Sequence, residues 1–135
     1  MFGASKIATG FLKARGGEKG FFLVIEGAQI DWGGHANVSD YIVTEMLDFD
    51  RAIGAVLDFA KKDGETLVIV TADHETGGYS INQGSTRDSL VTAFTSDYHT
   101  AEMIPVFAYG PGAENFSGIY DNTEIYHKIR KALGF

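Results

Sequence analysis

The sequence contains no cysteine, and this absence narrows the ways in which the chain can bind metal. Without cysteine there is no disulfide framework and no thiolate ligand, so any metal must be held by histidine, aspartate or glutamate. Cysteine usage also gives no indication of the redox compartment, because there is no thiol whose state would report it.

Basic residues are in the minority, and long apolar runs are absent. The chain has 11 lysines and arginines against 18 aspartates and glutamates, a formal charge of -7. Nucleic-acid phosphates attract basic patches, so this balance argues against a nucleic-acid partner. No apolar run reaches the roughly 18 residues of a membrane span, and the start, MFGASKIATGFLKARGGEKG, lacks the apolar core of a secretory signal.

The residues that are present favour one globular domain. With 135 residues, of which 44% are hydrophobic and 13% aromatic, the chain is long enough to bury a core. It shows no internal repeat, low-complexity tract or interdomain linker. We therefore expect a single domain over 1–135, with a leading helix and loop over 1–19 and an α/β core over 20–135.

The spacing of apolar residues predicts alternating helices and strands. Continuous apolar runs such as FFLVI are typical of strands buried on both faces, whereas apolar residues three and four positions apart indicate amphipathic helices. The predicted elements are a short helix closed by Gly16 and Gly17, a strand over 21–25, a helix capped by Asn37 or Ser39 and ended by Gly64, a strand over 66–72, one or two helical turns over 89–94, a strand over 103–110 and a terminal helix over 123–133. A strand, helix, strand order with apolar strands favours parallel pairing and an α/β fold.

Aspartate, glutamate and histidine side chains gather at the ends of the predicted strands. The candidates are Glu26, Asp31 and His35 after the first strand, Asp73 and His74 after the second, and His99 before the third. In an open parallel sheet, ligands collect beyond the carboxyl ends of the strands, so residues far apart in sequence meet there. One such histidine alone is ordinarily a packed core or surface residue. A crowded set of charges is costly without a cation, so the whole set favours a bound metal.

Zinc fits the candidates that include histidine. It accepts imidazole nitrogen and carboxylate oxygen, and an open coordination position makes it a Lewis acid. The candidates form two sets, Asp31, His35 and His99 for one zinc and Asp73 with His74 for a second. The first set leaves a coordination position open, whereas the second needs ligands from elsewhere. Glu26 has no histidine beside it, so its oxygen donor suits magnesium better.

Three motifs that contain these residues occur in an order similar to that of a known enzyme family. They are EGAQID with His35 nine positions after Glu26, then TADHETGG, then HTAEMIPVFAYGPGA. Over about residues 20–135, the chain resembles the C-terminal part of alkaline phosphatase. The resemblance implies a three-layer α/β/α fold with a mostly parallel central sheet, of which 1–135 is a partial domain.

The same resemblance implies an activity and a set of cofactors. Alkaline phosphatases hydrolyse phosphate monoesters through a phosphoserine intermediate, with two zinc ions and one magnesium ion. By similarity, the matching ligands are Asp31, His35 and His99 for the first zinc, Asp73 and His74 for the second, and Glu26 for magnesium. The family also implies a homodimer and a periplasmic or extracellular location.

Several parts of the family's active site have no match in this chain. No Asp-Ser-Ala segment occurs, and no serine or arginine lies in the context of the nucleophile or of the phosphate clamp. In the family these groups come from an N-terminal portion, so we expect the chain to need that portion as a partner and to be inactive alone. Trp32 follows Asp31 at a position where some members have lysine or histidine. The Trp32 side chain is either a neighbour of the phosphate or a residue that packs against the loop. The stretch from His74 to His99 is short, so we expect no large cap from it.

Two other functions are compatible with these residues. One is a truncated zinc-binding module without catalysis, and the other is a related metallohydrolase such as a sulfatase or phosphodiesterase, although the motifs favour the phosphomonoesterase. Glu75, beside His74, either supports the metal ligands or is an ordinary loop carboxylate. His127 is expected at the surface of the last helix.

Overall fold

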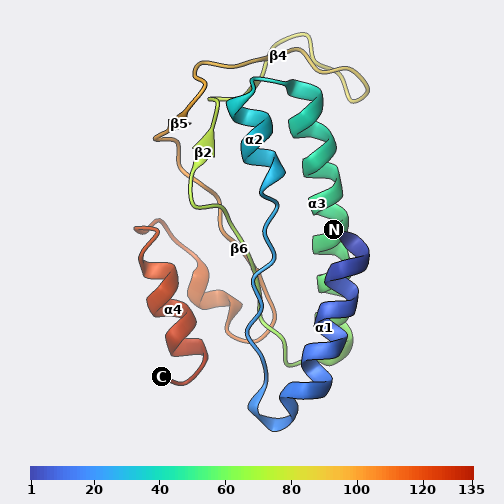
Figure 1. Cartoon of the computed structure of the whole chain (residues 1–135). Helices are drawn as coiled ribbons and strands as arrows, with labels where there is room; N and C mark the ends of the chain where they lie inside the picture. The colour runs from blue at the N-terminus through green and yellow to red at the C-terminus, as the bar shows by residue number, and fades with distance from the viewer.

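Two long helices, α1 (Phe2–Gly16) and α3 (Ser39–Asp63), lie side by side along one flank of the molecule (Figure 1). The computed structural model describes all residues, 1–135. The helix predicted near the N-terminus is confirmed, and it is longer than its few apolar residues indicate. Its small residues Ser5 and Thr9 are buried, and α1 packs against α3.

One stripe of α3 faces the interior. Ile42, Ala52, Ala55 and Ala60 are buried, and of these Ile42 and Ala60 belong to the apolar pattern from which the helix was predicted. The helix ends at Gly64, whose left-handed φ of 74° lets its N–H donate to the Ala60 carbonyl at 2.8 Å. The predicted glycine stop is therefore confirmed.

The start of α3 differs from the prediction. Val38 precedes the helix, and neither Asn37 nor Ser39 caps it with a side-chain hydrogen bond. The Ser39 hydroxyl is engaged with the Tyr79 hydroxyl at 2.8 Å instead, so it does not reach the free N–H groups of the first turn. Asn37 adopts a left-handed φ of 52°, which turns the chain into α3 from the preceding helix, α2 (Gln29–His35).

The strands form three short sheets of two strands each, all antiparallel. The pairs are β1 (Val68–Val70) with β6 (Phe107–Tyr109), β2 (Glu75–Thr76) with β5 (His99–Thr100), and β3 (Ser80–Ile81) with β4 (Thr92–Ala93). Strands do form within the predicted ranges 66–72 and 103–110, but they pair with each other in antiparallel fashion. The helical turns predicted over 89–94 are wrong, because β4 lies there and its backbone pairs with β3.

The segment 21–25, predicted as a strand, has no strand partner within this chain. It runs as an extended connection through the middle of the molecule (Figure 1). Its alternate side chains Phe22 and Val24 are 61% and 72% exposed, and Phe107 on β6 is 64% exposed. An apolar run predicts an extended backbone, but a strand also needs a neighbouring strand for its backbone hydrogen bonds. An extended segment with exposed apolar side chains is ready to pair with such a neighbour. The parallel pairing expected for 21–25 is therefore not formed by this chain alone.

Short elements complete the fold. They are the 3-10 helices η1 (Gly17–Lys19) and η2 (Ala113–Phe116) and the terminal helix α4 (Glu124–Ala132). The helix predicted over 123–133 is thus confirmed, and it packs against η2, where Phe116 is buried. None of the helices combines the length and the apolar character that a membrane crossing requires.

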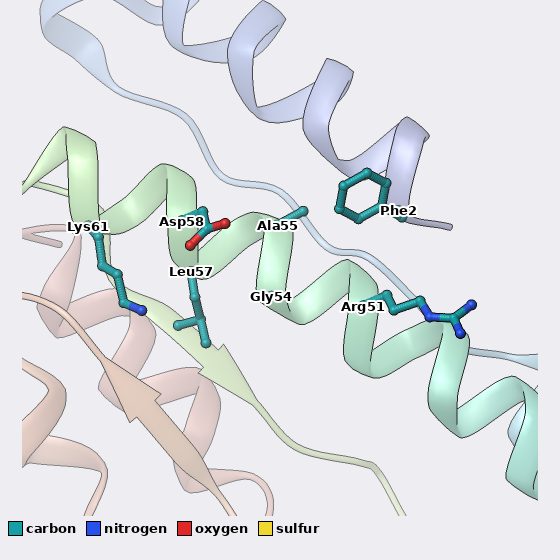
Figure 2. Close-up of a pocket in the computed structure, with 7 residues that line it drawn as sticks. All are labelled: Phe2, Arg51, Gly54, Ala55, Leu57, Asp58 and Lys61. Atoms are coloured by element: carbon teal, nitrogen blue, oxygen red, sulfur yellow. The ribbon is translucent and has the colours of Figure 1, made fainter.

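A shallow pocket lies between the start of α1 and the outer face of α3 (Figure 2). It is lined by Phe2, Arg51, Gly54, Ala55, Leu57, Asp58 and Lys61. The charged side chains of Arg51 and Lys61 extend in different directions and do not converge. None of the lining residues is a predicted metal ligand, so the candidate site lies elsewhere.

An ion pair ties the end of α1 to the end of α3. Lys13 Nζ lies 2.8 Å from Asp63 Oδ1 and 3.1 Å from Glu65 Oε2. Hydrogen bonds, first from Lys13 and then from Thr66, hold the pKa of the Asp63 carboxyl below its usual value. A carboxyl with a lowered pKa adds stability above its unfolded-state pKa, and this stability is lost as the pH falls through the folded-state value.

Replacing Lys13 with methionine is expected to lower the melting temperature at neutral pH by a few degrees at most, because exposed ion pairs contribute little. The difference from the unmodified chain should persist down to about pH 4 and disappear as the pH falls further. Melting curves followed by circular dichroism measure it. Lys61→Met is the matched control, because Lys61 lies near the end of α3 that carries Asp63 but forms no ion pair itself. Equal losses in both variants would contradict a role for the ion pair.

Candidate metal centre

α2 presents two of the candidate ligands on one side. Asp31 and His35 are four residues apart, which places their side chains one turn apart on the same helix face. Asp31 Oδ1 lies 3.5 Å from His35 Nε2. Gly33 and Gly34 between them are buried, and α2 packs directly against α3 and β2 at these positions. The two glycines therefore provide the close approach that holds this helix face in place.

β5 brings the third candidate, His99, to the same point. Its Nε2 lies 3.7 Å from Asp31 Oδ1, and the ligand atoms of Asp31, His35 and His99 all lie within 4.8 Å of one another. Two metal bonds of about 2.0 to 2.1 Å hold donor atoms at most about 4.2 Å apart, so the pairs that include Asp31 already fit, and the side chains would move slightly closer on binding a metal. One carboxylate and two imidazoles at these separations form a candidate site for a metal ion, in which His99 lies 68 positions after Asp31 in the sequence. 

The second ring nitrogen of His35 has a partner of its own. Nδ1 lies 2.8 Å from the backbone carbonyl oxygen of Asp97, to which it donates when it carries the ring proton. This tautomer leaves Nε2 unprotonated on the side of Asp31. Histidine ligands of metals ordinarily donate their other N–H to a carbonyl or carboxylate, so the surroundings of His35 fit a metal ligand.

The pair Asp73 and His74 adjoins this cluster without belonging to it. The His74 ring stacks on the His99 ring with centroids 3.5 Å apart and planes inclined by 21°. His74 Nε2 lies 3.3 Å from Asp73 Oδ2, and the Asp73 side chain is largely exposed. The structure thus places the second predicted pair next to the first set, as two candidate ligands without a third from this chain.

Glu26 and Trp32 lie apart from the cluster. Glu26 is exposed at the end of the extended segment before α2, and its carboxylate forms no hydrogen bond or ion pair in this chain. Trp32 follows Asp31 on α2, and its side chain is 62% exposed. The assignment of Glu26 to magnesium and of Trp32 to the phosphate side remain predictions.

Thr76 on β2 contacts the candidate ligands and is not among the candidates that the sequence indicates. Its hydroxyl donates to Asp31 Oδ1 at 2.5 Å and lies 3.3 Å from His74 Nδ1. It therefore contacts one candidate ligand from each predicted zinc set. The signal in the sequence was its place two residues after His74, which in a strand puts both side chains on the same face.

Glu75 is the second residue whose role the sequence left undecided. Burial raises the pKa of its carboxyl, but hydrogen bonds from the Thr100 hydroxyl and from the backbone N–H groups of Gly78 and Tyr79 outweigh burial and hold that pKa below its usual value. The carboxylate is thus ionised and fully engaged beside His74. It is not an ordinary loop carboxylate.

Comparison with known proteins identifies the family. A family model described as alkaline phosphatase matches residues 5–91 and 82–135. Alkaline phosphatase 3 of Bacillus subtilis (strain 168) is 32% identical over 94% of this chain and 43% of its own length. The alkaline phosphatase of Escherichia coli (strain K12) is 39% identical over 87% of this chain and 28% of its own length.

Solved structures of one relative share the fold. The alkaline phosphatase from the Antarctic bacterium TAB5 matches 98% of this chain and 40% of its own chain, with a TM-score of 0.88 and 49% identity. A mutant of the TAB5 enzyme with Mg bound in the M3 site matches 99% of this chain and 41% of its own, with a TM-score of 0.88 and 48% identity. These matches confirm the α/β fold of alkaline phosphatase type that the motifs implied.

The chain spans less than half the length of these relatives. The alignment with the Bacillus subtilis protein runs over 198 residues, so that relative carries residues that this chain of 135 lacks. The two matched ranges of the family model overlap over residues 82–91, within the short connection from His74 to His99. The match also begins at residue 5, earlier than the motifs indicated, so it includes most of α1. The chain belongs to the alkaline phosphatase family.

Proposed function

We propose that this chain is the metal-binding C-terminal part of an enzyme that hydrolyses phosphate monoesters. The observation that carries the proposal is the convergence of Asp31, His35 and His99 from α2 and β5, in a chain of the alkaline phosphatase family. The proposed ligands are Asp31, His35 and His99 for one zinc, Asp73 and His74 for a second zinc, and Glu26 for a magnesium ion. Bound there, the ions would supply Lewis-acid stabilisation of phosphoryl oxygens and lower the pKa of the attacking group.

This chain's own residues orient the site. The Asp97 carbonyl fixes the His35 tautomer, and Thr76 holds the Asp31 carboxylate. Positioned side chains of this kind reduce the reorganisation that a reaction requires, because ligands are already near their working geometry. The proposal assigns no catalytic nucleophile to the chain, because no serine lies in a matching context.

The nucleophilic serine and the phosphate clamp are proposed to come from the remaining portion of such an enzyme. The exposed apolar side chains of 21–25 and β6 support this, because further polypeptide would cover them, and 21–25 has no strand partner within this chain. The proposal therefore includes that portion as a partner and an isolated chain without phosphatase activity. A homodimer and a periplasmic or extracellular location are part of the same family-based proposal.

A chimeric enzyme tests the function. The matched portion of the TAB5 alkaline phosphatase is replaced by this chain, and hydrolysis of p-nitrophenyl phosphate is measured with zinc and magnesium present. We expect turnover by the chimera, none by the isolated chain, and a loss of about 100-fold or more in the chimera carrying His99→Ala, since this change removes a proposed metal ligand.

The same assay separates the two alternatives. A folded chimera that binds zinc without turnover would favour a zinc-binding module without catalysis. Faster hydrolysis of p-nitrophenyl sulfate or of bis(p-nitrophenyl) phosphate would favour a sulfatase or a phosphodiesterase. Either result would overturn the assignment as a phosphomonoesterase.

A further inference from the structure

Both carboxylate oxygens of Glu75 accept hydrogen bonds from within the protein. Oε2 accepts from the Gly78 N–H at 3.0 Å and from the Thr100 hydroxyl, and Oε1 accepts from the Tyr79 N–H at 3.1 Å. Glu75 itself lies on β2, Gly78 and Tyr79 form the turn after it, and Thr100 lies on β5. One side chain therefore joins a strand, its following turn and the partner strand.

The partner strand carries His99. In the register of β2 and β5, Glu75 faces Thr100 and Thr76 faces His99. The Gly77 N–H also donates to the carbonyl of the residue before His99 at 2.9 Å. The hydrogen bond from Thr100 to Glu75 thus acts one residue away from a proposed metal ligand.

A ladder of this length does not fix its own register. β2 and β5 have two residues each, and isolated two-stranded pairs are marginally stable even when they are longer. A slip of one residue would turn every side chain of β5 to the opposite face. His99 would then leave Asp31, and Thr100 would take its place.

The His99 ring is held in one orientation by its neighbours. It stacks on the His74 ring and on the Tyr98 ring, with centroids 3.5 Å and 4.7 Å apart. Stacked contacts of this kind require the backbone of β5 to stay in register with the segment that carries His74. A bond that fixes this register therefore also fixes where His99 Nε2 points.

We propose that Glu75 is a positioning residue that locks the register of β5 against β2 and so directs His99 toward Asp31. Its effect on metal binding rests on the proposed function, whereas its effect on the orientation of His99 does not. Glu75 has no part in the cluster of ligand atoms itself, so it acts through His99.

The first arm of the test uses the whole chain without metal. Nuclear magnetic resonance of the imidazole protons of His99 reports its stacking, because the rings of His74 and Tyr98 shift these resonances upfield. In Glu75→Ala we expect the His99 resonances to move toward the positions of an unstacked histidine, and the Gly78 and Tyr79 amides to exchange faster. Unchanged His99 resonances in a folded Glu75→Ala chain would overturn the proposal, whatever the chain does with metal.

The second arm measures zinc affinity by competition with a chelator, with zinc as the only added ligand. Replacing a group that orients a metal ligand ordinarily costs about 10- to 100-fold in metal affinity, and we expect this loss in Glu75→Ala. Glu75→Gln keeps one carbonyl oxygen as an acceptor and should recover part of the affinity. Thr100→Val keeps the shape of the side chain but removes the hydroxyl, and it should reproduce part of the loss.

Glu102→Gln is the matched control for charge. Glu102 is exposed three residues after His99 and forms no side-chain hydrogen bond, so its replacement removes a nearby negative charge without touching β2. Equal zinc affinities in Glu75→Gln, Thr100→Val and the unmodified chain would overturn the proposal, as would equal losses in Glu102→Gln and Glu75→Gln. If Glu75→Ala does not fold, the Gln and Val variants decide in both arms. If the unmodified chain binds no zinc, the metal centre does not assemble within this chain alone, and the first arm then decides whether Glu75 positions His99.

Discussion

His99→Ala is expected to lower the zinc affinity of this chain by about 100-fold or more. Structural zinc sites with four protein ligands bind with about 10 to 16 kcal/mol, or about 3 kcal/mol for each ligand, which corresponds to about two orders of magnitude. His99 is one of the three residues whose ligand atoms converge, so its loss leaves only Asp31 and His35. The measurement is zinc stoichiometry and affinity on the chain after chelator treatment and refilling. The unmodified chain should bind about one zinc tightly.

His127→Ala is the matched control for this experiment. His127 is exposed on α4, where its ring contacts only the neighbouring Tyr126 ring among the aromatic side chains. Its replacement also removes one histidine, but not one of the cluster, so zinc binding should be unchanged. Tight zinc binding that survives His99→Ala would contradict the proposed ligand set. An unmodified chain without tight zinc would show that the Asp31, His35 and His99 centre does not assemble within this chain alone.

Local patterns in the sequence predicted α1, α3 and α4 but not the shorter helix α2. The apolar spacing of α3 and α4 and the stop at Gly64 depend on residues within a few positions of one another, so the sequence contains the needed information. Asp31 and His35 were predicted as residues that follow a strand, whereas the structure places them one turn apart on α2, where an i, i+4 pair faces one way. That His99 joins them was inferred from its place near a strand end and from the family motifs, since no local pattern relates β5 to α2.

Pairing between distant segments was predicted less well. The strand order favoured parallel pairing, but β1 pairs with β6 in antiparallel fashion and 21–25 has no partner here. Apolar runs show that a segment is buried or extended, yet they carry no information about which neighbour it finds or in which direction. The same limit applies to Glu75, whose hydrogen bonds reach β5 across 25 positions of sequence.

Gly34→Ala is expected to have the second large effect. A Cβ at Gly34 would lie 2.8 Å from the Cβ, the Cγ2 and the carbonyl oxygen of Thr76. Because the backbone of β2 is among these atoms, no side-chain rotation relieves the clash, and α2 and β2 must separate. Overpacking of this kind costs about 1 to 3 kcal/mol of stability. The separation also stretches the hydrogen bond from Thr76 to Asp31, so we expect zinc affinity to fall by about 10-fold or more.

Gly54→Ala makes the same chemical change where there is room for it. Gly54 lies within α3 in the shallow pocket of Figure 2, and nothing lies within 4 Å of the position that its Cβ would take. Alanine in a helix interior is favoured over glycine by about 0.5 to 1 kcal/mol, so Gly54→Ala should stabilise the chain and leave zinc binding unchanged. Helix propensity alone predicts that both substitutions stabilise, because Gly34 also lies in a helix. Close packing of α2 against β2 predicts that the two substitutions change the free energy of unfolding in opposite directions. Chemical denaturation of the two variants therefore decides between these explanations. A stabilised Gly34→Ala chain would show that this contact does not hold Asp31 in place.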